Sequence, residues 1–145
     1  SMPHPPNAAR ITQLSGKQLS RCSFALAAAK RFSREARVQQ LGLGIAEEAV
    51  RGTAMEGEGW RNWSGVLYGL ARAGISCQQS STVQQLFERA VEQRLPEVLR
   101  THGQQCEAQS VANTFLACHY AGFMGSLQQL VSAVGSRVGV VMAVK

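Results

Sequence analysis

The sequence predicts an all-α fold, a short right-handed α-solenoid of about three helix-turn-helix repeats. One apolar pattern occurs three times, as "LSRCSFALAAAKRF" (19–32), "WSGVLYGLARAGI" (63–75) and "VANTFLACHYAGF" (111–123). The copies begin 44 and then 48 residues apart, a spacing typical of solenoid repeats. A single helix pair cannot bury its apolar face, whereas stacked pairs share a continuous core.

The first helix of each repeat is predicted from the spacing of its apolar residues. The second copy places such residues at i, i+3, i+4 and i+7, which gathers them on one helical face: Trp63, Val66, Leu67 and Leu70. Gly74 and Gly122 stand where helices often end in a left-handed residue, since glycine has no Cβ to clash there. Ile75 and Phe123 follow as the apolar contacts that accompany such an ending.

A second helix is expected after each first one, over 34–51, 83–95 and 127–144. The expected caps are Ser33 and two capping boxes, Thr82 with Gln85 and Ser126 with Gln129. Pro96 suits the first position of a helix and predicts a short extra helix over 96–102. Strand signals are weak, and only residues 138–144 have a β-like pattern.

Residues 1–10 are expected to form a disordered leader. Residues 11–145 are expected to form one helical-repeat domain, with repeats at about 15–52, 58–100 and 106–145. The end units of so short a stack have no neighbour to cover them. This predicts a fragment of a longer array, a cap at each end, or self-association through the end repeats.

The charge is positive and unevenly distributed along the 145 residues. The formal net charge is +6, and residues 1–52 hold eight of the fifteen basic side chains but three of the nine acidic ones. The densest basic run contains Lys30, Arg31, Arg34 and Arg37. This balance permits an anionic partner such as nucleic acid, and its alternative reading is a solvated basic face.

Hydropathy and cysteine usage indicate the compartment. No stretch approaches the ~18 apolar residues of a membrane span, so no membrane partner is expected. The four cysteines form no CxxC pair. We expect free, mostly buried thiols, with Cys22 and Cys118 on core-facing stripes, and therefore a reducing, intracellular compartment.

The sequence carries no enzyme signature. It has no Asp for a Ser-His-Asp triad and no GxxxxGK[ST] phosphate loop. The nearest approach to a zinc site is formed by His102, Cys106, Cys118 and His119, whose spacing without a CxxC pair matches known zinc sites poorly. We therefore expect a non-enzymatic protein with no cofactor and no metal.

The candidate binding residues are the polar residues of the first helices. With Leu19, Trp63 and Val111 pointing inward, the positions two before, two after and nine after project to the opposite side. Seven binding residues follow: Lys17, Arg21, Arg61, Arg72, Gln109, Asn113 and Tyr120, with Ala28 and Gly65 completing the rows and Lys30, Arg31, Arg34 and Arg37 as a secondary basic cluster. Basic and amide groups suit phosphate oxygens and base edges, and a tyrosine can stack on a base. The alternative is a polar face that meets only solvent.

The segments "SGKQLSRCSFALAAAKRF", "WSGVLYGLARAGI" and "EAQSVANTFLACHYAGF" resemble octotricopeptide-type repeats, over roughly residues 11–135. Phe24, Tyr68 and Leu116 stand where that family usually has Trp. Similar repeats occur in FAST-kinase-like and heptatricopeptide proteins of organelles, and "VANTFLACHYAGF" is similar to SKWP-repeat type III effectors of plant-pathogenic bacteria. The organelle branch implies single-stranded RNA as ligand, in a mitochondrion or plastid. The effector branch implies a host-protein partner or an adaptor role after secretion into a host cell.

Charge and resemblance together predict a non-enzymatic helical-repeat module that binds single-stranded RNA through a basic and polar face. The alternative is a protein-interaction scaffold that forms part of a bacterial type III effector. A continuous basic surface over Lys17, Arg21, Arg61 and Arg72 would favour RNA.

Overall fold

The computed structural model describes residues 13–31, 34–102, 107–128, 130–132 and 135, and this part of the chain is helical without a strand. The helices are α2 (Gly16–Ala29), α3 (Glu35–Arg51), α4 (Trp60–Arg72), α5 (Ser81–Glu88), the π-helical segment η1 (Arg89–Arg94), α6 (Leu95–His102) and α7 (Ala108–Ala121). The all-α prediction is confirmed. The expected leader, the β-like stretch 138–144, Ser33 and Gln129 lie outside the described residues, as does most of the expected helix 127–144.

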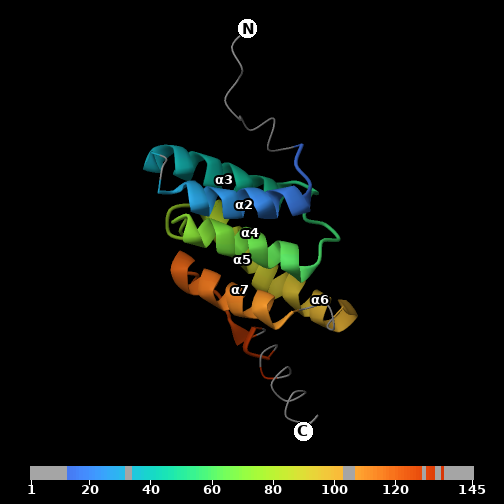
Figure 1. The fold of residues 1–145 in the computed structure, drawn as a ribbon. Coiled ribbons are helices and arrows are strands. Elements are labelled where there is room, and N and C mark those ends of the chain that lie inside the picture. The colour runs from blue at the N-terminus through green and yellow to red at the C-terminus, as the bar shows by residue number, and fades with distance from the viewer. Residues whose placement is uncertain (1–12, 32–33, 103–106, 129, 133–134, 136–145) are drawn as a thin grey trace.

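The predicted first helices form one layer. α2, α4 and α7 lie side by side with α4 in the middle, and all three run in the same direction (Figure 1). α3 packs against α2 and against α5, so α3 and α5 form a second layer. The N-terminal ends of α2, α4 and α7 therefore lie together at one side of the molecule.

The core is centred on α4. Leu19, Trp63 and Val111, the predicted inward residues of the three first helices, are all fully buried, so this prediction is confirmed. Burial of such large apolar side chains is the main force that holds the layers together. The indole Nε1 of Trp60 donates a hydrogen bond of 3.1 Å to the hydroxyl of Thr114, which joins α4 to α7 inside the core.

α2 and α4 approach each other very closely. A Cβ added to Gly69 would lie 2.5 Å from the backbone carbon of Ser23, and one added to Gly65 would lie 2.0 Å from the hydroxyl of Ser20. At Gly69 the contact is with the backbone of α2, so only hydrogen fits there without moving a helix, whereas at Gly65 the contact is with a side chain of α2.

Replacing Gly69 with Ala is therefore expected to lower the free energy of unfolding by about 1–3 kcal/mol, because the new methyl group overpacks a rigid backbone contact. Urea denaturation followed by circular dichroism measures the change. The matched control is Gly135→Ala, since a Cβ there meets no described atom within 4 Å. Equal stability of the two variants would show that the two helices do not approach this closely.

The predicted glycine endings of the first helices are confirmed for α4 and α7. Gly74 and Gly122 have φ of +86° and +67°. The backbone N–H of Ile75 donates to the carbonyl of Leu70 (3.0 Å), and that of Phe123 donates to the carbonyl of Cys118 (2.9 Å). Ile75 and Phe123 are buried, as expected for the apolar contact that closes such a motif.

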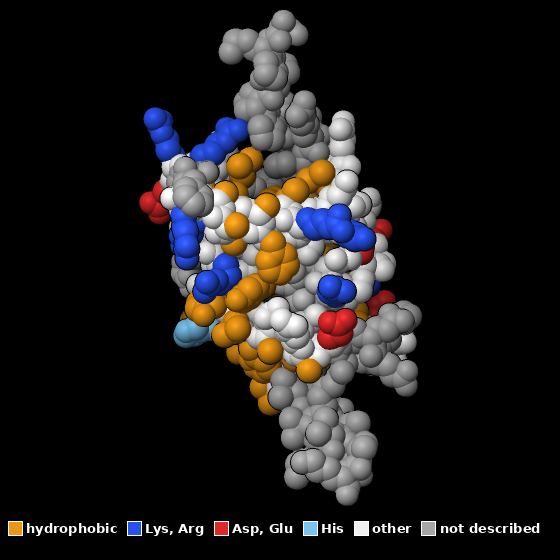
Figure 2. All heavy atoms as spheres, in the orientation of Figure 1, with side chains coloured by type: hydrophobic (Ala, Val, Ile, Leu, Met, Phe, Trp, Pro, Cys, Tyr) orange, Lys and Arg blue, Asp and Glu red, His pale blue; other side chains and the backbone are white. Residues whose placement is uncertain are grey.

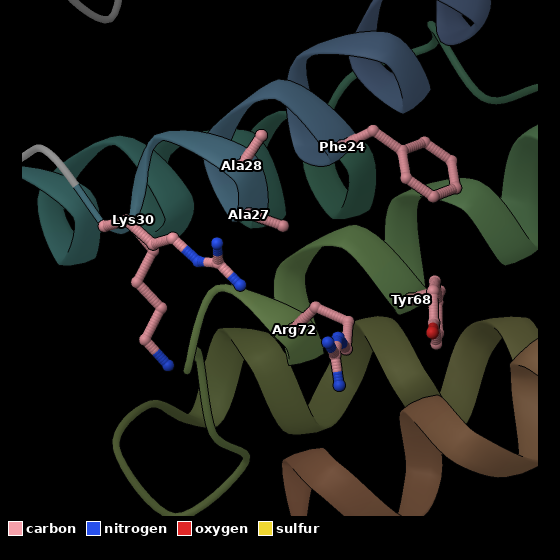
Figure 3. Close-up of a pocket in the computed structure, with 7 residues that line it drawn as sticks. Phe24, Ala27, Ala28, Lys30, Tyr68 and Arg72 are labelled. Carbon is pink, nitrogen blue, oxygen red and sulfur yellow. The ribbon is translucent and has the colours of Figure 1, made fainter.

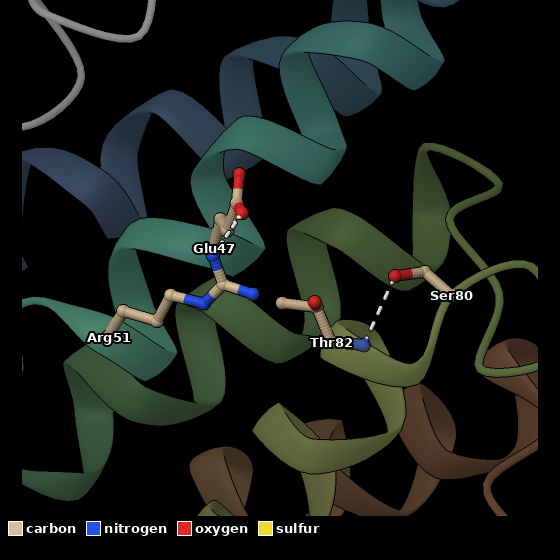
Figure 4. A network of polar contacts seen from close by, with 4 residues as sticks. All are labelled: Glu47, Arg51, Ser80 and Thr82. Atoms are coloured by element: carbon tan, nitrogen blue, oxygen red, sulfur yellow. Dashed lines mark hydrogen bonds and ion pairs between the residues drawn. The ribbon is translucent and has the colours of Figure 1, made fainter.

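The cap of α5 differs from the prediction. Ser80, not Thr82, is the N-cap, and its hydroxyl accepts a hydrogen bond of 3.1 Å from the backbone N–H of Thr82 (Figure 4). Ser80 has an extended backbone, whereas the helix has already begun at Ser81. Ser80, Ser81 and Thr82 all carry hydroxyl groups that can cap a helix, and Ser80 is the N-cap because it is the last residue with an extended backbone before the helix. Figure 4 also shows the ion pair between Glu47 and Arg51 near the end of α3.

The short extra helix expected over 96–102 is confirmed as α6, although it begins one residue earlier and is not separated from the helix before it. α5, η1 and α6 follow one another without a break, and α6 begins at Leu95. Proline has no N–H to donate, and its ring clashes with the carbonyl four residues earlier in an α-helix. The π-helical segment η1 ends at Arg94, two residues before Pro96, and the backbone N–H of Leu95 donates to the carbonyl of Ala90, five residues earlier. A wider turn of this kind accommodates a proline within a continuous run of helix.

Candidate functional site

Five of the seven predicted binding residues line one hollow, which we call the N-terminal hollow. It encloses about 630 Å³ between the first turns of α2, α4 and α7. The predicted residues in its wall are Lys17, Arg21, Arg61, Gln109 and Asn113. The three helices place them together because they are parallel and begin at the same side of the molecule.

The N-terminal hollow is electropositive. Lys17, Arg21 and Arg61 are exposed, and none of them forms an ion pair with a described acidic side chain. Glu107 is the one carboxylate among the described residues in the wall. Glu58, nearby in sequence, accepts a hydrogen bond of 2.7 Å from the amide of Asn62. Three cations therefore face one carboxylate.

A second hollow lies at the other end of the same face, and we call it the C-terminal hollow. It encloses about 780 Å³ and is lined by Phe24, Ala27, Ala28, Lys30, Arg31, Tyr68 and Arg72 (Figure 3). No acidic side chain is among the described residues of its wall. The guanidinium of Arg72 stands 5.4 Å from the ring centroid of Tyr120, so the last two predicted residues are in cation–π contact.

The secondary basic cluster is divided by the fold. Lys30 and Arg31, at the end of α2, line the C-terminal hollow. Arg34 and Arg37, at the start of α3, are not among the residues that line either hollow. The chain passes from the first layer to the second between α2 and α3, so the four residues of this basic cluster are divided between two surfaces.

Exposed apolar side chains on α2 and α7 form an apolar strip on the same face, of which only Tyr120 was predicted. Phe24, Leu116 and Tyr120 are 45%, 40% and 47% exposed. The rings of Phe24 and Tyr68 are 6.1 Å apart at a tilt of 56°. Figure 2 shows basic side chains at both ends of this face, with apolar side chains between them.

The sequence contains a pattern that indicates this apolar strip. Phe24, Tyr68 and Leu116 each follow the inward residue of their copy by five positions, which is the place where the resembling family has Trp. Five residues at 100° per residue carry a side chain well away from the inward direction, so a bulky apolar residue there in every copy is unusual for a solvated face.

Gly65 is the one position of the predicted rows that the structure buries. The close approach of α2 covers it, although its backbone still contributes to the wall of the N-terminal hollow. The geometry of a single helix predicts that Gly65 points outward, whereas the packing of α2 against α4 buries it.

The thiols are partly as predicted. Cys118 is buried and so is Cys77, whereas Cys22, which was expected on the core stripe, is only partly buried. Burial raises the pKa of the Cys77 thiol to about 11, with a smaller contribution from Glu88. Burial likewise raises the pKa of the Cys118 thiol to about 12, with a smaller contribution from Cys77.

Cys77 and Cys118 are expected to react slowly with a thiol reagent at pH 8 in the native state, because the thiolate is the nucleophile and both pKa values are raised. Raising the pH toward 11 should increase their native rates. Denaturation at pH 8 should make both react fast. Mass spectrometry of labelled peptides distinguishes the four cysteines, and equal native and denatured rates for these two would contradict their burial.

The zinc alternative falls partly outside the described residues, since Cys106 and the side chain of His102 are not described. Within the part of the chain that is described, no group of three His, Cys, Asp or Glu side chains is placed to hold a metal ion. Cys118 points into the core, whereas the adjacent His119 is exposed.

Comparisons with protein-family models, with curated proteins and with solved structures find no match for this chain. Among the described helices, none combines the length and apolar character that crossing a membrane requires.

Proposed function

We propose that the helices form a short right-handed α-solenoid of about three repeats, and that this chain is a non-enzymatic module that binds single-stranded RNA. The binding face is the exposed side of α2, α4 and α7, from the N-terminal hollow to the C-terminal hollow. The resemblance to octotricopeptide-type repeats agrees with both parts of the proposal.

The repeat architecture is supported by interactions that recur. First helices pack against first helices, and the second helices α3 and α5 pack against each other. The carbonyl of Gly74 accepts a hydrogen bond of 3.1 Å from the amide of Gln39, and that of Gly122 accepts one of 2.7 Å from Gln78. At the ends of α4 and α7, a glutamine from an earlier part of the chain thus donates to the glycine carbonyl.

The observation that carries the RNA proposal is the set of three cations in the N-terminal hollow that have no carboxylate partner among the described residues. Lys17, Arg21 and Arg61 can each bind a phosphate oxygen, and arginine can do so with two parallel hydrogen bonds. The amides of Gln109 and Asn113, on the same wall, can reach base edges. The start of a helix adds partial positive charge at this side.

A single strand fits the face better than a duplex does. Phe24 and Tyr120 expose ring surface, and unpaired bases can stack on such rings while paired bases cannot. Phe24 lines both hollows together with their cations, and Tyr120 lies beside Arg72, so one face combines a stacking surface with phosphate contacts.

Fluorescence polarisation with a random single-stranded RNA, repeated at several salt concentrations, tests this function. Three or four phosphate contacts would give a log–log slope of about −2 to −3, which is roughly a 16- to 64-fold loss of affinity between 50 and 200 mM salt. If the wild-type chain shows no salt-sensitive binding to any RNA, the positive charge is a solvated surface and the RNA proposal is wrong.

A protein-interaction scaffold is the second candidate, and exposed apolar side chains after α7 favour it. Met124 is 82% exposed and Val131 is also largely exposed. Both residues follow α7, the first helix of the proposed third repeat. Apolar side chains at the end of a repeat stack suit a further repeat, a protein partner or self-association. This candidate becomes the leading one if the RNA titration fails.

A further inference from the structure

We propose that Phe24 is a base-stacking platform, and that the single strand lies along the axes of α2 and α4 with its phosphates bound at both ends. This inference rests on the proposed RNA binding. It names the path of the strand and the residue on which a base stacks.

Phe24 stands between the two hollows. It lines the N-terminal hollow together with Arg21 and Arg61, and it lines the C-terminal hollow together with Lys30 and Arg72. Its ring extends from α2 toward α4, over Tyr68 (Figure 3). Phe24 is 45% exposed, so part of its ring surface is accessible to a base.

Tyr68 holds this platform in place. The two ring centroids are 6.1 Å apart and the planes are tilted by 56°, an arrangement that aromatic pairs prefer over a parallel sandwich. Tyr68 is only partly exposed, so it supports Phe24 from the α4 side. A ring that is fixed before binding loses little conformational entropy when a base stacks on it.

Cations stand at both ends of this platform. Lys17 belongs to the first turn of α2 and Lys30 is its C-cap, so the two lie about 20 Å apart along the helix at 1.5 Å per residue. Such a distance suits a strand of about four nucleotides, the lower end of single-strand site sizes. Arg61 and Arg72 repeat the arrangement on α4.

The charges favour a path along the helices over a path across all three. α7 contains no Lys or Arg, and its N-cap is Glu107. At the position equivalent to Phe24, α7 has Leu116, which offers no π face for stacking. A strand that crossed from α2 to α7 would leave the cations and approach a carboxylate, whereas one along α2 and α4 keeps cations at both ends.

Two labelled strands of about eight nucleotides test this path: an oligouridine and an abasic oligoribonucleotide of the same length. We expect the wild-type chain to bind oligouridine roughly 5- to 100-fold more tightly than the abasic strand, because stacking needs a base while phosphate contacts do not. Phe24→Leu should remove most of this preference and leave the salt slope unchanged. Phe24→Tyr should retain it.

Met124→Ala is the matched control, since it truncates an exposed apolar side chain outside both hollows, and it should bind both strands as the wild-type chain does. Leu116→Ala, at the equivalent position of α7, tests the path of the strand and should cost less than Phe24→Leu does. Equal wild-type affinity for the two strands, or an unchanged preference in Phe24→Leu, would overturn the stacking platform while RNA binding stands. A loss in Leu116→Ala as large as that in Phe24→Leu would show that the strand crosses the helices. If the wild-type chain binds neither strand, the inference and the proposed function both fail.

Discussion

Replacing Leu70 with Ala is expected to lower the free energy of unfolding by ~2–5 kcal/mol, because a buried leucine loses its transfer free energy and leaves a cavity. Leu70 is fully buried near the end of α4, the central helix of the first layer. α4 packs against both α2 and α7, so a cavity there weakens contacts to both neighbours.

Urea denaturation of the wild-type and variant chains measures the difference. The control is Met124→Ala, since that side chain is almost entirely exposed and its truncation should change stability by less than about 0.5 kcal/mol. A cost below about 0.5 kcal/mol for Leu70→Ala would show that the inward face of α4 is wrongly placed.

The first helices could be predicted because their signals are local. Apolar residues at helical spacing select the inward face, and Trp63 and Leu70 are buried as that spacing requires. Gly74 and Gly122 mark the ends because only glycine adopts a positive φ at little cost. Neither inference needs knowledge of what the helix packs against.

The features that were missed depend on neighbours in space. The burial of Gly65 follows from the approach of Ser20 on another helix. The cap at Ser80 follows from where the chain leaves the preceding loop, which the hydroxyl residues alone do not show. The partial exposure of Cys22 depends on how α2 is rotated against α4, and helical periodicity defines that rotation only approximately.

The sequence predicts which residues belong to the candidate site, but it does not predict how those residues are arranged on the surface. The exposure of Lys17, Arg21, Arg61 and Arg72 agrees with the geometry of a single helix. Their division between two hollows, with Phe24 between, depends on the packing of parallel helices and could not be read from one helix at a time.

The double variant Arg21→Ala, Arg61→Ala is expected to weaken RNA binding and to reduce the log–log salt slope by about 1.4, since each lost phosphate contact removes about 0.7 on a single strand. Both arginines are exposed and line the N-terminal hollow, so thermal stability should remain nearly unchanged.

The matched control is Arg51→Ala, Arg100→Ala, which removes the same charge from exposed positions on α3 and α6, outside both hollows. The decisive measurement is the salt dependence of the dissociation constant for single-stranded RNA, in the wild-type chain and in both double variants. We predict a slope of about −2 to −3 for the wild-type chain and the control, and a slope closer to zero by about 1.4 for Arg21→Ala, Arg61→Ala. Equal slopes for the two double variants would contradict a binding face on α2, α4 and α7.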